Sequence, residues 1–221
     1  MHPLPNYARR IEYLESTGTQ YVDTGVCVGP LSRSETDVAV MDWDATTYAL
    51  SGVTETNGRH SFGKGYAGSS TGAGNASKLY FGLGAQNYTT SVSLSSLVGV
   101  RHVYWIDAPS ATAGMDDSTF ALTSAGALAS NTRPSFLLAQ SISGVRGQMA
   151  ARLYGCRYYV SGVPVHSFVP CRVDQTGYLW DEVTGAFFGN SGTGNFVLGT
   201  VIAGGGASRH ADPAPSARRA A

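Results

Sequence analysis

Short runs in which apolar and polar residues alternate dominate the chain. In the run "SETDVAVMDWD", the side chains of Thr36, Val38 and Val40 fall on one face of an extended strand, and their neighbours fall on the other. The runs "KLYFGLG" and "RHVYWIDA" are further strand candidates, and the second alternates strongly. A period of two residues is typical of half-buried β-strands. The pattern therefore predicts an all-β protein, with helix limited to a turn near "SLSSLVG" or "TSAGALA".

The segment "MAARLYGCRYYVSGVPVHSFVPCR" predicts a hairpin that turns at Ser161-Gly162. With the turn there, Cys156 pairs with Ser167 and Cys171 pairs with Arg152. The two sulfurs would share a face but lie roughly 13 Å apart along the strands, whereas a disulfide needs Cα atoms within about 7 Å. The chain has only three cysteines, at positions 27, 156 and 171, so we expect buried free thiols rather than a disulfide framework.

Large aromatic residues and glycine-rich turns alternate in "GYLWDEVTGAFFGNSGTGNF" (177–196). Tyr178 and Trp180 fall on one strand face, and the turn 182–185 places Gly185 where a positive φ is wanted. The glycines lie at strand ends and not before a helix, which argues against a phosphate cradle. The run therefore predicts a β meander with an aromatic core face.

The composition narrows the class of protein. The 221 residues include 15 Lys and Arg and 15 Asp and Glu, so the formal net charge is zero. A balanced chain offers no global field for nucleic acid or an anionic membrane, and no apolar stretch approaches the roughly 20 residues of a membrane span. The opening "MHPLPNYARR" lacks the apolar region of a signal peptide, so export by that route is not expected.

The chain divides into three parts by composition. Residues 1–10 are a lead-in segment, residues 11–203 form the sandwich domain, and residues 204–221 are a tail rich in Gly, Ala, Pro and Arg. The tail has no core-forming side chain, so it is either flexible or docked on a partner. In a docked tail, three arginines would meet carboxylates or backbone carbonyls: Arg209, Arg218 and Arg219.

Three blocks carry a resemblance to a known family. "YLESTGTQYVDTGV", "RLYGCRYYVSGVPVHSFVPCR" and "GYLWDEVTGAFFGNSGTGNF" resemble, in this order, the signature blocks of concanavalin A-like lectin/glucanase domains, the LamG-like jelly rolls of phage structural proteins and gut-bacterial surface proteins. The resemblance covers residues 7–199. It implies two curved antiparallel sheets packed face to face, and it leaves the function open because this fold hosts lectins, hydrolases and structural modules.

Catalytic constellations are hard to find in the sequence. Glycosidases of this fold commonly carry Glu-x-Asp-x-x-Glu on a strand; Glu35 and Asp37 begin this pattern, but Val40 occupies the place of the second glutamate. Asp42-Trp43-Asp44 has two acids and no glutamate. The histidines are dispersed, and Gly-x-Gly-x-x-Gly at 63–68 does not precede a helix. We therefore expect no enzyme activity.

Binding residues can be proposed by type. Aromatic residues near loops, with planar polar neighbours, are typical of shallow sugar sites, and they also form protein interfaces. The candidates are Asp42, Trp43, Tyr66, Asn87 and Tyr88. No cofactor is expected, although LamG-like domains often bind Ca²⁺ through aspartates; candidates by residue type are Asp23, Asp42, Asp44, Asp107, Asp116 and Asp117.

The sequence thus favours a non-catalytic module of a phage virion. Such a protein would decorate a capsid or belong to a head or tail fibre at the virion surface, with lectin-like adhesion to glycans. Its partners would be other virion subunits and surface glycans, in a homo-oligomer or a larger assembly, without nucleic acid or membrane insertion. Two alternatives stay open: a glycan hydrolase of a bacterial surface, and a purely architectural cementing protein.

Overall fold

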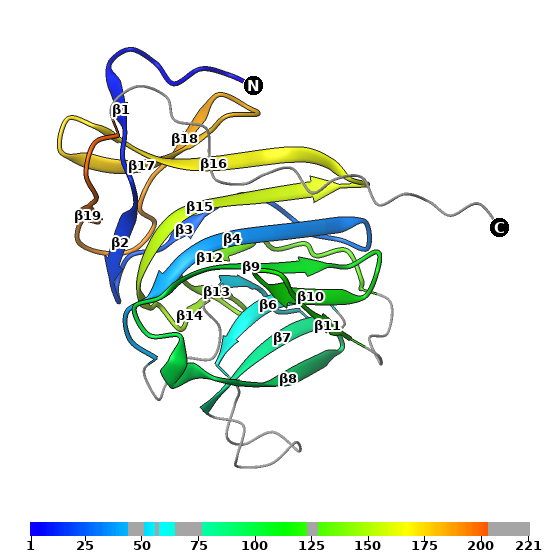
Figure 1. Cartoon of the computed structure of the whole chain (residues 1–221). Coiled ribbons are helices and arrows are strands. Elements are labelled where there is room, and N and C mark those ends of the chain that lie inside the picture. The colour runs from blue at the N-terminus through cyan, green and yellow to red at the C-terminus, as the bar shows by residue number, and fades with distance from the viewer. Residues whose placement is uncertain (44–50, 56–57, 65–76, 123–127, 203–221) are drawn as a thin grey trace.

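The computed structural model describes residues 1–43, 51–55, 58–64, 77–122 and 128–202, and within them the chain forms two sheets packed as a sandwich (Figure 1). The larger sheet contains β1 (Ala8–Arg10), β2 (Leu14–Thr17), β4 (Ser32–Val40), β9 (Arg101–Asp107), β10 (Thr112–Met115), β11 (Ser118–Ala121), β15 (Ala150–Val160), β16 (Val163–Val173), β17 (Thr176–Asp181), β18 (Ala186–Phe188) and β19 (Val197–Leu198). The smaller sheet contains β3 (Val22–Asp23), β5 (Ser51–Val53), β6 (Arg59–Lys64), β7 (Lys78–Gly84), β8 (Gln86–Ser93), β12 (Phe136–Leu137), β13 (Gln140–Ser141) and β14 (Val145–Arg146). The predicted all-β sandwich is confirmed.

The order of the strands determines which of them lie at the edges. The main path of the larger sheet is β11-β10-β9-β4-β15-β16-β17-β18, and that of the smaller sheet is β14-β13-β5-β6-β7-β8. The described pairings are antiparallel except for the pair β5 and β13. The 3-10 turn η2 (Leu94–Ser96) lies in "SLSSLVG", as predicted. No helix in the described part of the chain is long and apolar enough to cross a membrane.

The core lies between the two sheets. Val38 and Val40 of β4 point into it and are almost completely buried, as the alternation predicts. Phe62 of β6 stacks on Tyr104 of β9, with ring centroids 4.8 Å apart, and so joins the two layers. Each side chain of this size that is removed from water contributes about 1.5 to 3 kcal/mol. Burial between the sheets is therefore the main source of stability.

The predicted hairpin turn is confirmed, but the predicted register is wrong. Ser161 and Gly162 have φ of 51° and 78°, as a two-residue turn of type I′ requires. A bulge between Tyr158 and Tyr159 then shifts the pairing by one residue, so that Cys156 lies opposite Phe168 and not Ser167. Because side chains alternate with a period of two, a shift by one residue exchanges the faces.

This register determines on which face of the larger sheet Cys156 and Cys171 lie. Cys171 pairs with Tyr178 of β17 and Arg10 of β1, not with Arg152. Cys156 belongs to the core between the sheets, whereas Cys171 belongs to a separate cluster on the outer face of the larger sheet, so the two sulfurs do not share a face. All three thiols are free. Cys156 and Cys171 are buried as expected, but Cys27 is exposed.

The aromatic residues of the run 177–196 do not form the main core. Trp180 clusters with Tyr178 and Phe187 on the outer face of the larger sheet, while the alternate residue Leu179 points into the sandwich and is fully buried. The first ten residues lie over this outer cluster (Figure 1), where the indole N–H of Trp180 donates to the carbonyl of His2 at 3.2 Å. The meander is as predicted, but its aromatic face is covered by the N-terminal segment. The predicted tail, 204–221, lies outside the described residues.

Candidate functional site

The free edges of the two sheets meet at β8 and β11 and bound a groove of about 670 Å³, here called the edge groove. Within the described residues, β8 pairs only with β7, and β11 pairs only with β10. The residues that line the edge groove are Phe81, Asn87, Tyr88, Thr89, Thr90, Thr119, Phe120, Ala121 and Leu122. Consecutive residues of both strands contribute, as expected of a groove bordered by two strand edges.

The floor of the edge groove is apolar and aromatic. Tyr88 lies opposite Phe81 in the pairing of β7 with β8, so both side chains are on the inner face of the smaller sheet. Phe120 of β11 reaches the same place from the larger sheet, and its ring lies 5.7 Å from that of Phe81. Phe81 and Leu122 are buried, whereas Tyr88 and Phe120 are half-buried. The rings of Tyr88 and Phe120 are thus partly accessible from the groove, and the buried Phe81 and Leu122 lie beneath them.

The rim of the edge groove is polar. Asn87 and Thr119 are exposed, and Thr89 is half-buried. Thr90 has a structural role, because its hydroxyl donates to the carbonyl of Leu79 at 3.0 Å and accepts a bond from the amide of Val92. The groove therefore combines an aromatic floor with amide and hydroxyl groups at its border, a combination suited to small polar ligands that have an apolar face.

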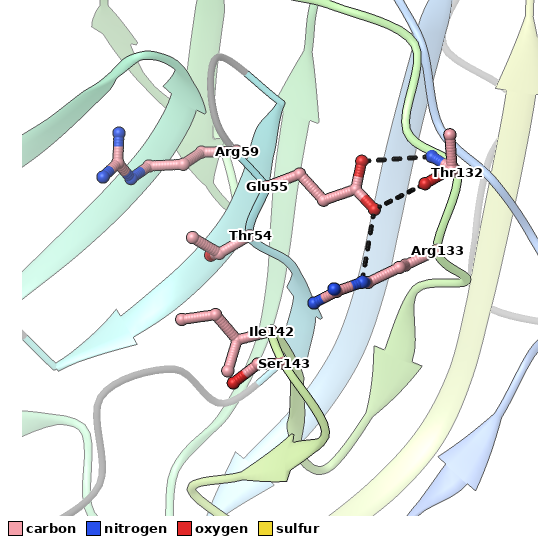
Figure 2. A pocket seen from close by; sticks show the side chains of 7 residues that line it. All are labelled: Thr54, Glu55, Arg59, Thr132, Arg133, Ile142 and Ser143. Carbon is pink, nitrogen blue, oxygen red and sulfur yellow. Dashed lines mark hydrogen bonds and ion pairs between the residues drawn. The ribbon is translucent and has the colours of Figure 1, made fainter.

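A second hollow, here called the charged pocket, lies near the ends of β5 and β13 and has a volume of about 570 Å³ (Figure 2). Its lining residues are Thr54, Glu55, Arg59, Thr132, Arg133, Ile142 and Ser143. Thr54 and Glu55 follow β5, Arg59 begins β6, and Ile142 and Ser143 follow β13. The chain before β12 closes the pocket with Thr132 and Arg133.

Glu55 organises the charged pocket. Its carboxylate accepts a hydrogen bond of 3.1 Å from the amide of Thr132 and one of 3.0 Å from the hydroxyl of the same residue. The Nε atom of Arg133 lies 3.6 Å from the same carboxylate. Partial burial opposes the ionisation of Glu55, but the hydrogen bonds from Thr132 and the charge of Arg133 outweigh it and lower its pKa. Glu55 therefore stays ionised at neutral pH.

Two further polar groups adjoin this pocket. Arg59 extends along the other wall, where one Nη atom donates to the carbonyl of Ala85. Asn131 is 5% exposed, and neither amide atom has a hydrogen-bond partner within the described part of the chain. The Asn131 side chain packs against Gly58: a Cβ atom at that glycine would lie 2.4 Å from Asn131 Oδ1 and 3.3 Å from the Cβ of Glu55.

The edge groove includes two of the five binding residues that the sequence suggests. Asn87 and Tyr88 lie in it, whereas Asp42 and Trp43 follow the far end of β4. Ser34 of β4 lies level with Phe120 across the sheet, through the pairs of β4 with β9, β9 with β10 and β10 with β11. Val40 is six residues further along β4, which corresponds to about 20 Å at strand rise, so the residues after it lie far from the edge groove. Asp42 is exposed there, and Trp43 packs against the core with its indole N–H buried. Tyr66 lies outside the described residues.

Several residues of both sites are missing from the sequence prediction. Phe120 and Thr119 sit in "STFA", whose alternation is compatible with a strand but does not reveal that this strand is an edge. Glu55 and Thr132 are 77 residues apart and meet only in the folded chain. The sequence around Glu55 therefore does not indicate that its carboxylate will bind a residue so far along the chain.

The acids considered for catalysis are engaged in ion pairs. Glu35 accepts from Arg33 at 2.9 Å, and the hydroxyl of Tyr159 lies 3.3 Å from its other oxygen. Asp37 accepts two hydrogen bonds from the guanidinium of Arg101, at 2.7 Å and 2.6 Å. Each carboxylate is thereby tied to an arginine on the outer face of the larger sheet.

The candidate calcium ligands are dispersed. The carboxylate of Asp23 accepts a hydrogen bond of 2.9 Å from the amide of Gly25 within a local turn. The carboxylate of Asp116 lies 2.7 Å from Nδ1 of His102, and the carboxylate of Asp107 accepts a hydrogen bond from the hydroxyl of Ser110. Within the described ranges, no three His, Cys, Asp or Glu side chains gather as they would around a metal ion. Asp44 lies outside those ranges.

A similar fold occurs in the crystal structure of a candidate carbohydrate-binding protein from Bacteroides ovatus ATCC 8483, with a TM-score of 0.58 and 13% sequence identity. The match covers 88% of this chain and 61% of that chain, so this protein spans less than two thirds of its neighbour. No protein-family model and no curated protein matches the chain. At 13% identity the likeness shows a shared β-sandwich fold and nothing beyond it.

Proposed function

We propose that the protein is a non-catalytic carbohydrate-binding module and that the glycan lies in the edge groove. The observation that carries this proposal is the combination of Tyr88 and Phe120 on the floor with Asn87 and threonine hydroxyls at the rim. The C–H faces of a sugar pack on aromatic rings, and its hydroxyls exchange hydrogen bonds with amide and hydroxyl side chains. The B. ovatus neighbour supports this reading because its fold serves a candidate carbohydrate-binding protein.

The finer assignment rests on the signature blocks. Their resemblance to concanavalin A-like jelly rolls supports a place at a phage virion surface, as capsid decoration or part of a head or tail fibre. In such an assembly the partners are other virion subunits and surface glycans, and the arginines of the tail, at 209, 218 and 219, dock on a neighbouring subunit. Deletion of residues 204–221 should then weaken assembly and leave the melting temperature of the domain nearly unchanged.

Glycan hydrolysis is less well supported. A glycosidase holds two carboxyl groups about 5 to 9 Å apart around the scissile bond, and one of them must be free to donate a proton. Glu35 and Asp37 are both paired with arginines, so each carboxylate already has a structural partner. Incubation of the purified protein with oligosaccharides, followed by chromatography of the products, should reveal no cleavage.

An architectural role is the second candidate, and the free strand edges favour it. An unpaired edge presents a row of N–H and C=O groups that can pair with another chain, and β8 and β11 present two such edges. A cementing protein would use this border for a protein partner instead of a sugar.

A glycan array separates these two functions. The wild-type protein should show saturable binding to a subset of glycans, and the affinity of Tyr88→Ala for these glycans should be at least tenfold lower. Tyr7→Ala is the matched control, because Tyr7 is 67% exposed on the N-terminal segment, away from the groove. A protein that binds no glycan on the array would favour the cementing role.

A further inference from the structure

We infer that the charged pocket is a second binding site, which takes the carboxylate of an acidic sugar. The sugar part of this inference rests on the proposed function, whereas the anion site rests on the pocket alone. The residues that line the pocket include two arginines, Arg59 and Arg133, and one carboxylate, Glu55; the Arg133 side chain faces Glu55, whereas the guanidinium of Arg59 points away from both (Figure 2). Because Glu55 is ionised, it balances only one of the two arginines. The lining therefore carries an excess of one positive charge.

The contact with Glu55 orients Arg133 for a ligand. The carboxylate of Glu55 engages the Nε atom of Arg133, and the two Nη groups extend away from it toward Thr54 and Ile142 (Figure 2). Within the described residues, no other hydrogen-bond or ion-pair partner of Arg133 is found. The outer edge of a guanidinium presents parallel N–H donors that match the two oxygens of a carboxylate. With its Nε side turned to Glu55, the guanidinium of Arg133 leaves its two Nη groups available to a carboxylate ligand.

The rest of the lining suits a sugar ring. Gln140 donates to the hydroxyl oxygen of Thr54, so the hydrogen of that hydroxyl is available to a ligand oxygen. Ser143 is exposed beside it, and Ile142 offers a small apolar surface. These groups are better matched to a polyhydroxylated ligand than to a bare inorganic anion.

The charged pocket and the edge groove approach each other on the smaller sheet. A Cβ atom at Gly82 would lie 3.2 Å from Asn87 Oδ1, of the groove, and 3.3 Å from the Cβ of Arg59, of the pocket. Asn87 of the groove and Arg59 of the pocket are therefore near neighbours on the face of the smaller sheet opposite to Tyr88, because successive residues of a strand alternate between faces.

Isothermal titration calorimetry with glucuronate, glucose, acetate and inorganic phosphate tests the inference. The wild-type protein should bind glucuronate at least tenfold more tightly than the other three ligands, and Arg133→Gln should abolish that difference. Arg146→Gln is the control, because Arg146 is exposed on β14 and does not line the pocket. Arg133 is itself 47% exposed, so its substitution should leave the melting temperature unchanged. Thr54→Val offers a second variant, which should weaken glucuronate binding without removing a charge.

The results of this experiment distinguish the charged pocket from the edge groove. Glucuronate binding that survives in Tyr88→Ala and disappears in Arg133→Gln supports the pocket even if no neutral glycan binds. Equal affinity for glucuronate, acetate and phosphate would overturn the assignment to a sugar and leave a general anion site. Equal affinity of wild type and Arg133→Gln for glucuronate would overturn the site itself.

Discussion

The ring of Phe81, on the smaller sheet, lies 5.7 Å from the ring of Phe120, on the larger sheet. This contact joins the two sheets at the border where β8 and β11 each pair with a single strand in the described part of the chain. It also forms the floor of the edge groove under Tyr88. The groove and the core thus share one wall, and the shape of the proposed binding site depends on the packing of the sandwich.

Replacement of Phe120 should therefore affect both stability and binding. Phe120→Ala removes a half-buried ring, and we expect the free energy of unfolding to fall by about 2 kcal/mol, less than the ~3 to 5 kcal/mol of a fully buried phenylalanine. The affinity for glycans should fall as well, because half of the aromatic floor is lost. Urea unfolding and calorimetry measure the two effects.

Phe187→Ala is the matched control for this change. Phe187 packs on Trp180 in the outer cluster, with ring centroids 4.7 Å apart, and it has no part in the edge groove. Its loss should reduce stability and leave glycan affinity unchanged. Unaltered binding by Phe120→Ala would argue against the groove.

The stability of the fold should depend on pH through His60. Burial lowers the pKa of His60 to about 4, so the folded state keeps this histidine neutral, while the unfolded state takes up a proton near pH 6.5. The unfolded state thus binds more protons in this window, and the free energy of unfolding should fall by about 1.4 kcal/mol per unit as the pH drops from about 6.5 toward 4. Chemical denaturation at several pH values between 6.5 and 4.5 gives the slope.

His60→Gln tests the origin of this slope. The variant lacks the titrating imidazole, so its stability should vary less with pH in the same window, whatever its absolute value. Glu55 and Asp181, whose pKa values are lowered in the folded state, act at lower pH, because the stability they contribute is lost only as the unfolded carboxylates become protonated near pH 4. An identical slope in wild type and variant would show that other groups control the transition.

Thiol reactivity should distinguish the three cysteines. Cys156 and Cys171 are buried, and desolvation raises the pKa of each to about 12, so neither forms the reactive thiolate. Cys27 is exposed. We expect one thiol per chain to react quickly with a disulfide reagent in buffer and three in denaturant. In the Cys27→Ser variant, no thiol should react quickly in buffer. Fast labelling of a second thiol in the wild-type protein would contradict the burial of Cys156 and Cys171.

The hairpin turn offers two substitutions with opposite expected effects. Gly162 has a φ of 78°, where a side chain is strained, so Gly162→Ala should lower the free energy of unfolding by about 1 kcal/mol. Ser161 has a φ of 51°, a conformation that asparagine tolerates better than serine. Ser161→Asn should therefore raise the melting temperature slightly. Changes of the same sign in both variants would contradict a type I′ turn.

The sequence is sufficient to predict the elements whose signal is local. The alternation around Val38 and the Ser161-Gly162 turn identify strands and a hairpin because both depend on neighbouring residues alone. The register of that hairpin is not predictable in this way, because the bulge at Tyr158 and Tyr159 depends on packing across the sheet. A single extra residue was enough to move Cys171 to the opposite face from Cys156.

The candidate sites are even less visible in the sequence. Tyr88 and Asn87 are recognisable by type, but the position of β8 at an edge is a result of the order of strands in the whole sheet. The partner edge comes from residues about 30 positions later, and the contact of Glu55 with Thr132 spans 77 positions. Sites built from such distant segments become evident only when the chain is folded.

The most direct test of the proposed function is an NMR titration of the ¹⁵N-labelled protein with the glycan that binds best on the array. Amide shifts should change in residues 87–90 and 119–122, the two strand edges of the groove, and should stay constant in the outer cluster around Trp180. Tyr88→Ala should suppress these changes. Saturable shifts centred on another surface of the sandwich, with residues 87–90 and 119–122 unaffected, would contradict the assignment of the glycan site to the edge groove.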